Sequence, residues 1–211
     1  MDEYRLTDNL YIGVTPAGAY YAVSGSETDL PRQLLRALLS QDSSPQLTLE
    51  GIQDWIGNTD DNECLSLLYH VQNLGWVEGI EEERHLPHGV LEDVVPDFLP
   101  VLSSNGKALL ADSQGFYVTT HGFTHEAAEE LSALSADIAS LHDRHRGLLI
   151  NNLNLKTDAW ALIDAAGNSQ IGFWPLFVGD QRFVLVLGGI PHFNHQAMTN
   201  LVWVLSARYG I

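Results

Sequence analysis

The stretch of residues 105–147 constrains the fold of this chain more than any other. It contains a short apolar segment, the turn sequence DSQG at residues 112–115, and an aromatic and β-branched segment at residues 116–120. Aspartate at the first position and glycine at the last are typical of a β-turn, so the two segments are predicted to form a hairpin. Thr124 is then placed to cap a long helix that we expect to end near Gly147.

The predicted helix carries two distinct stripes. Apolar residues recur at alternating intervals of three and four, which is the period of one helix face, at Ala127, Leu131, Leu134, Ile138, Leu141 and His145. We expect this stripe to cover the helix's own sheet. A second stripe consists of the small residues Ala133, Ala136 and Ala139, which would let a partner approach closely.

The composition indicates a globular protein. The chain has 211 residues, so one large or two small domains are expected, and hydrophobic residues make up 45% of it. No apolar run reaches the ~18 residues of a membrane helix, and the N-terminus lacks the basic and apolar regions of a signal peptide. The single cysteine, Cys64, excludes an internal disulfide framework. These features predict a cytoplasmic protein without membrane insertion.

The net charge of -17 is unevenly distributed along the chain. Residues 1–95 contain 17 Asp and Glu against 4 Arg, whereas residues 96–211 contain 10 acidic against 6 basic residues. Such an acidic chain is repelled by nucleic acid and by anionic membranes. The change in character near residue 95 supports a division into two domains.

Residues 1–80 are predicted to form an α/β module. Strands are expected at residues 10–14 and 19–23, separated by the turn sequence TPAG, and a short strand is expected at residues 76–80. Between them lie three helical segments, beginning near Asp29, Thr48 and Asn62. This order resembles a winged-helix module.

In a winged-helix module the third helix would enter the DNA groove. Here no Lys or Arg occurs between Arg36 and Arg84, and an acidic triplet occupies residues 81–83, where a wing would meet the phosphate backbone. DNA readers need Lys or Arg for phosphate contacts. The sequence therefore favours a protein-binding or dimerising module over a DNA-binding one.

A linker at residues 81–93 leads to a second predicted domain at residues 94–211. Its expected order is short helix, two strands, long helix, three strands and a last helix near residues 194–209. Hairpin connections predict a five-stranded antiparallel sheet covered by helices, an α+β fold. The last helix is apolar almost all round, so it should be buried on more than one side. Pro175 should lie at an edge or a bulge of its strand.

The second domain resembles the roadblock/dynein light-chain family. The resemblance rests on a small-apolar strand at residues 108–111, the turn residues Asp112 and Gly115, a second strand, and Gly122 before the long helix. It implies a roadblock/longin-like fold that dimerises through its sheet edge and long helix and has no catalytic residues. Bacterial members of the family act beside small Ras-like GTPases, and others are scaffold subunits.

These observations lead to three functional hypotheses. The first is a non-enzymatic regulatory or scaffold homodimer that binds a small Ras-like GTPase or another protein. The second is a transcriptional regulator whose first module binds DNA, and the third is a metal-dependent enzyme that uses histidine pairs. For the first hypothesis, the expected protein-interface residues are Ala133, Ala136, Asp137 and Ser140 of the long helix and Trp160 and Leu162 of a strand.

The sequence offers little catalytic chemistry. Nine histidines include several close pairs, of which His142 and His145 lie one turn apart on the long helix and have the spacing to share a metal. Neither an HExxH motif nor a nearby cysteine supports a metal site, and histidine is favoured at a helix C-terminus in any case. Cys64 has the position of a small core residue. We therefore predict no catalytic, cofactor-binding or metal-ligating residues.

Overall fold

The computed structural model describes residues 5–210 and shows an α+β protein. The helices are α1 (Pro16–Val23), α2 (Leu30–Leu39), α3 (Leu49–Ile56), α4 (Asp61–Asn73), α5 (Leu91–Phe98), α6 (His125–Arg146) and α7 (Gln196–Tyr209), with the short 3-10 segment η1 (Pro100–Leu102) and the π-helical segment η2 (Gly147–Asn152). The strands are β1 (Tyr11–Val14), β2 (Val77–Ile80), β3 (Ala108–Ala111), β4 (Tyr117–His121), β5 (Trp160–Ile163), β6 (Ser169–Val178) and β7 (Gln181–Gly188).

The strand predicted at residues 19–23 is wrong, because this segment is the second half of α1. The sequence TPAG starts a helix instead of a turn: the Thr15 hydroxyl accepts a hydrogen bond from the Gly18 amide, and Pro16 occupies the first turn, where its missing N–H costs nothing. Ala19 and Ala22 are fully buried on this helix. β1 therefore pairs with β2, from Tyr11–Ile80 to Val14–Val77.

The three helices predicted after this point are confirmed, and side chains cap each of them. The N-cap side chain accepts a hydrogen bond from the amide three residues later, in the pairs Asp29–Arg32, Thr48–Gly51 and Asp60–Glu63. Gly57 ends α3 in the left-handed conformation, with φ of 65°. These local signals are readable in the sequence because each needs only neighbouring residues.

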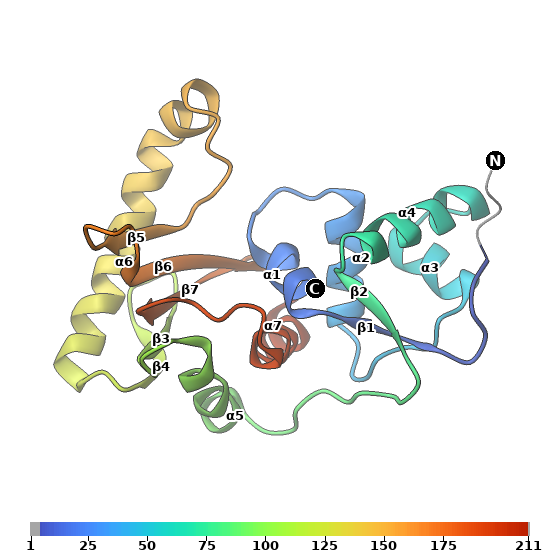
Figure 1. The fold of residues 1–211 in the computed structure, drawn as a ribbon, viewed down its shortest axis with the longest axis horizontal. Coiled ribbons are helices and arrows are strands. Elements are labelled where there is room, and N and C mark those ends of the chain that lie inside the picture. Colours follow the sequence, from blue (N-terminus) through green and yellow to red (C-terminus); the bar gives the residue numbers. More distant parts are fainter. Residues whose placement is uncertain (1–4, 211) are drawn as a thin grey trace.

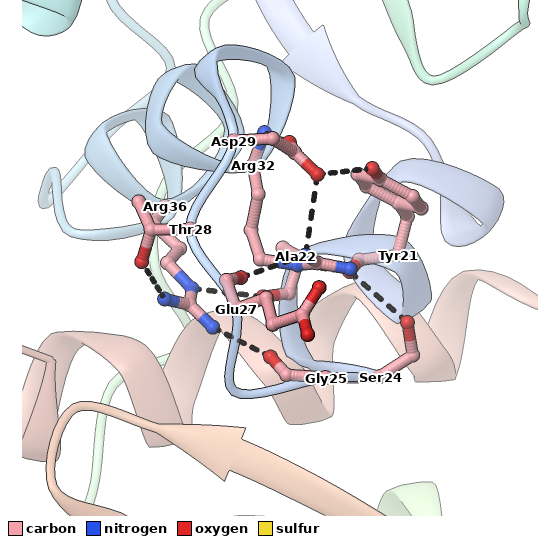
Figure 2. A network of polar contacts seen from close by, with 9 residues as sticks. All are labelled: Tyr21, Ala22, Ser24, Gly25, Glu27, Thr28, Asp29, Arg32 and Arg36. Atoms are coloured by element: carbon pink, nitrogen blue, oxygen red, sulfur yellow. Dashed lines mark hydrogen bonds and ion pairs between the residues drawn. The ribbon is translucent and has the colours of Figure 1, made fainter. Parts of the chain in front are cut away.

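Two arginines of α2 hold the loop between α1 and α2 (Figure 2). Arg32 donates hydrogen bonds to the carbonyl oxygens of Tyr21 and Glu27, and its guanidinium lies 4.4 Å from the centre of the Tyr21 ring. Arg36 donates to the carbonyl oxygen of Gly25 at 2.9 Å. Both guanidinium groups therefore satisfy backbone carbonyls of their own module.

The large sheet has the strand order β4-β3-β7-β6-β5, and all its pairs are antiparallel. This confirms the predicted five-stranded antiparallel sheet. The predicted β3–β4 hairpin is also present: the Asp112 carboxylate accepts hydrogen bonds from the amides of Gln114 and Phe116, and Gly115 has φ of 88°. β5 begins opposite Phe173, so within residues 5–210 no strand pairs with β6 on that side at Pro175, as expected for a proline.

The turn glycine Gly115 also lies against α6. A Cβ atom at this position would approach the Ala136 Cβ and the Ala133 Cα to 3.3 Å. We expect Gly115→Ala to lower the free energy of unfolding by about 2 kcal/mol, because it adds crowding to the strain of a positive φ. Urea unfolding measures the change. Gly167→Ala is the matched control, since Gly167 has φ of 86° with open space around it and should show only the strain. Equal losses of unfolding free energy in the two variants would contradict a packing contact between Gly115 and α6.

Helices cover both faces of the sheet. Side chains alternate along the central strands: Leu109 and Val186 point to the α6 face, whereas Leu110, Leu185 and Leu187 point to the α7 face. β3 and β7 are thus buried on both sides, which explains their continuous apolar sequences. α5 contacts the edge strand β4, whereas the main contacts of β5 are with β6.

α7 lies between the sheet and the N-terminal helices (Figure 1). The Trp203 indole donates a hydrogen bond to the Gln41 carbonyl at 2.7 Å, and the rings of Tyr20 and Phe193 stack at 4.8 Å. Residues before and after the predicted linker belong to one cluster of buried side chains. The prediction that the last helix is buried on more than one side is confirmed, and the second surface is the N-terminal module.

As predicted, α6 ends next to Gly147, at Arg146, but the helical path does not stop there. Gly147 keeps a helical backbone, with φ of −60°, and the chain continues into η2. Residues 148–152 are thus helical. Asn154, with φ of 54°, is the first left-handed residue after the helix. Asparagine tolerates this conformation better than most residues, so it can end the helix where glycine was expected.

Candidate protein-interaction surface

α6 packs on the sheet through a stripe of small and polar residues. Its fully buried residues recur at helical spacing, and they are Ala128, Ser132, Ser135, Ala139 and His142. This corrects the expectation that the apolar stripe would cover the sheet. Small side chains let the helix lie close to the strands, and the two serine hydroxyls remain satisfied because each donates to a backbone carbonyl of α6 at 2.7 Å.

The apolar stripe of α6 is only partly used. Leu131 and Ile138 pack against the cluster beneath the helix, but Leu134 and Leu141 remain 41% and 38% exposed. At about 100° per residue, these two leucines lie on the flank opposite Ala136. Ile138, which packs on the cluster beneath the helix, borders the same flank. This leucine flank has no covering element among residues 5–210.

β5 is an edge strand that carries no charged side chain, although its pairing with β6 is irregular between Leu162 and Ile163. Its sequence, WALI, contains no charge, proline or bulky polar residue, and all four residues are exposed. Leu162 and Ile163 are 63% and 64% exposed. Trp160 and Leu162 pair with Phe173 and Ile171 of β6, so they share the sheet face on which α6 lies. An exposed apolar edge of this kind is a template for pairing with another chain.

A buried histidine attaches the start of β5 to α6. The Trp160 indole nitrogen donates a hydrogen bond to His142 Nδ1 at 3.1 Å. Since an indole only donates, Nδ1 is unprotonated and the proton of a neutral imidazole lies on Nε2. The Asp158 carboxylate lies 3.0 Å from Nε2, although not in line with its N–H. This cluster fixes the position of the edge strand relative to the helix.

Exposed apolar side chains are concentrated in this part of the chain. Of the fifteen large apolar residues exposed within residues 5–210, eight lie between residues 134 and 163. The segment around η2 contributes Leu148, Leu153 and Leu155, which are 49%, 56% and 46% exposed. α6 and η2 extend beyond the edge of the sheet at β5 (Figure 1). A concentration of this kind marks an interaction site more often than chance exposure.

The structure places the six predicted interface residues in two different environments. Trp160 and Leu162 lie on the exposed edge strand, which Trp160 attaches to α6 through His142. Ala133 and Ala136 contact the chain's own hairpin turn at Gly115. The other two, Asp137 and Ser140, are exposed on the outer side of α6. We define the β5–α6 surface as Leu134, Leu141, Trp160 and Leu162.

Sequence reasoning missed Leu134 and Leu141 as surface residues. Their helical spacing was recognised, but apolar spacing alone does not say whether a stripe meets the sheet or a partner. The neighbouring stripe of Ala128, Ser132, Ser135 and Ala139 was the available signal, because small residues at helical spacing permit the closest approach to a sheet.

The other candidate residues offer no assembled chemical site. His142 is buried and bonded to Trp160, while His145, one turn later, is exposed. Within residues 5–210, no group of three or more His, Cys, Asp or Glu side chains is arranged to hold a metal ion. The same range contains no helix with both the length and the apolar character needed to span a membrane.

Cys64 should react slowly with Ellman's reagent in the native protein and rapidly in urea. Its thiol is fully buried, and burial together with the charges of Asp60, Asp61 and Glu63 raises its pKa. A raised pKa leaves less of the reactive thiolate at a given pH. The test compares rates at one pH with and without denaturant. A native rate equal to that of free cysteine would contradict the buried position.

The basic residues of the N-terminal module are largely committed to internal contacts. Arg32 and Arg36 bind the α1–α2 loop, and Arg84 forms an ion pair with Glu78 at 3.0 Å. Three of the four arginines in residues 1–95 therefore have partners within the chain. Phosphate contacts would have to compete with these interactions.

Comparisons with protein families, curated proteins and solved structures found no match to this chain.

Proposed function

We propose that this chain is a regulatory or scaffold protein that forms a homodimer through the β5–α6 surface. The observation that carries the proposal is an uncharged, exposed edge strand beside exposed leucines of α6. Residues 94–211 would then act as a roadblock/longin-like dimerisation domain, in line with the resemblance of their hairpin and long helix to that family. The acidic, winged-helix-like N-terminal module would serve as an adaptor for another protein.

The proposed dimer would have a two-fold axis perpendicular to the sheet. Such an axis would place β5 antiparallel to β5 of a second copy and extend the sheet across the dimer. It would also place the two α6 helices antiparallel. α6 runs across the sheet from β4, where His125 contacts Tyr117, to β5, where His142 contacts Trp160, so the C-terminal halves of the two helices would lie nearest the axis.

Charge gives a second reason for this surface. Two copies that each carry a net charge of -17 repel one another at long range. They associate most easily through a patch without net charge, where contact removes apolar area from water. The exposed, uncharged side chains Leu134, Leu141, Trp160 and Leu162 would supply such a patch.

Sedimentation equilibrium of the full chain tests the proposed dimer. We expect the mass of two 23.3-kDa chains at micromolar concentration. Persistence of the monomer at the highest soluble concentration would refute self-association through this surface. Because salt screens the long-range repulsion between copies, moderate salt should strengthen the dimer.

The partner class implied by the family resemblance is a small Ras-like GTPase. Immobilised full-length protein and a Leu162→Glu variant would be incubated with native lysate, and the eluates assayed for binding of labelled GTP. A GTP-binding protein retained by the dimer, and lost from the variant, would support this assignment. Equal retention by both would place the partner elsewhere, and failure to retain any would refute the GTPase assignment while leaving the dimer intact.

A further inference from the structure

A groove on the N-terminal module lies between α4 and the strand β2. It is open to solvent and has a volume of about 120 Å³; its apolar lining includes Leu6, Leu10, Leu65, Leu68 and Val77, and Arg5, Thr7, Gln72 and Glu78 line it as well. An apolar cavity of about 150 Å³ is large enough for benzene. The groove is therefore suited to one branched apolar side chain. The groove lies in the N-terminal module, beside the two-stranded sheet of β1 and β2, whereas the β5–α6 surface belongs to the five-stranded sheet.

β2 lines this groove with an unpaired edge. Its strand neighbour within residues 5–210 is β1, on one side. The Ile12 amide donates to the Pro45 carbonyl, away from β2, so Ile12 and its partner Gly79 form a pair without mutual hydrogen bonds. The N–H and C=O of Gly79 therefore point to the free side. Alternation along the strand gives Val77 the same orientation.

The charge of the N-terminal module indicates which kind of peptide segment would be attracted to the groove. Residues 37–83, which include α4 and β2, contain ten Asp and Glu and no Lys or Arg. Glu78 and Arg84 neutralise each other at 3.0 Å, and Arg5 is the basic residue on the groove wall. The negative charge therefore belongs to the module as a whole, in which residues 1–95 contain 17 acidic and 4 basic residues, and at long range it repels nucleic acid and attracts a basic segment.

We propose that this groove binds an extended, basic peptide segment of another protein. The segment would add to β2 as a third strand, with backbone hydrogen bonds to Val77 and Gly79, and would insert an apolar side chain between Leu65 and Leu68. Backbone pairing supplies affinity in this recognition mode, and pockets for alternate side chains supply specificity. The N-terminal module thereby has a partner site that does not depend on the proposed dimer.

Selection from a displayed library of random peptides on the immobilised full chain tests this assignment. We expect enriched sequences to combine Lys or Arg with apolar residues at alternate positions. The binding of one synthesised, fluorescently labelled selected peptide is then measured by anisotropy. Rising salt should weaken it, because the attraction is partly long-range. Enrichment of acidic peptides, enrichment of helical spacing, or no enrichment would overturn the proposal.

Two variants and a control localise the binding. Gly79→Pro removes the outward N–H without removing a bond to β1, and Leu65→Gln places a polar group on the groove wall. Each should weaken the selected peptide by about tenfold. Leu74→Gln changes an exposed leucine just after α4, outside the groove, and should leave binding unchanged. Wild-type affinity in either groove variant, with a native circular dichroism spectrum, would overturn the site.

Discussion

Leu162→Glu is expected to convert the proposed dimer into a monomer. Leu162 is 63% exposed on the edge strand, so the substitution should leave the folding of the chain intact. In a two-fold dimer each substitution occurs twice, and both carboxylates would be brought to the same interface. Burying an unpaired charge is costly. We expect the dissociation constant to rise at least about a hundredfold, or about 2.7 kcal/mol, in sedimentation equilibrium.

Leu30→Glu provides the matched control for this substitution. Leu30 is 51% exposed at the start of α2, outside the β5–α6 surface. The same change in size and charge there should leave the sedimenting mass unaltered. A dimer that survives Leu162→Glu, or one that is lost equally with Leu30→Glu, would show that the edge strand is not the contact.

Gly18→Ala should cause the largest loss of stability among the single substitutions considered for this chain. Gly18 is buried in α1, and a Cβ atom there would lie 2.1 Å from the backbone oxygen of Trp76. The Thr15 amide donates to the same oxygen, and the Thr15 hydroxyl donates to the Gly75 carbonyl, so this backbone cannot move away freely. We expect a loss of at least about 3 kcal/mol in urea unfolding.

Gly147→Ala separates this packing effect from helix propensity. Gly147 has a helical backbone, and nothing lies within 4 Å of an added Cβ atom. Alanine should therefore raise the free energy of unfolding by about 0.5–1 kcal/mol, because glycine loses more backbone entropy on folding. Opposite signs for the two substitutions are the expected result. A mild effect of Gly18→Ala would mean that α1 does not approach Trp76 so closely.

The β3–β4 hairpin and the helix caps were predictable because their signals are local. Asp112 and Gly115 serve one turn, and Thr124 caps the helix that follows it, so each role depends on neighbouring residues. Residues 19–23 were misassigned because AYYAV suits a strand as well as a short helix. The helical conformation is favoured by the N-cap Thr15, by Pro16 in the first turn and by the packing of α1 on α7.

The candidate surface was predictable only in part. Trp160 and Leu162 were identified from an apolar strand sequence, but its position at the sheet edge depends on the strand order β7-β6-β5. The leucine flank of α6 was predicted to cover the sheet. Which stripe packs inward depends on the distance between helix and strands, and the small residues Ala128 and Ala139 allow the closer approach.

Local signals in the sequence predict the α+β class, the order of the elements in residues 94–211, the hairpin turn, the helix caps and the acidic character of the N-terminal half. These follow from periodicity, turn chemistry and composition, which involve residues close together in the chain. Long-range packing places α7 between the two halves, leaves Leu134 and Leu141 of α6 exposed, and puts β2 and β5 at sheet edges within residues 5–210. Those properties arise from pairing between segments distant in the sequence, where side-chain volume and strand order outweigh local preference.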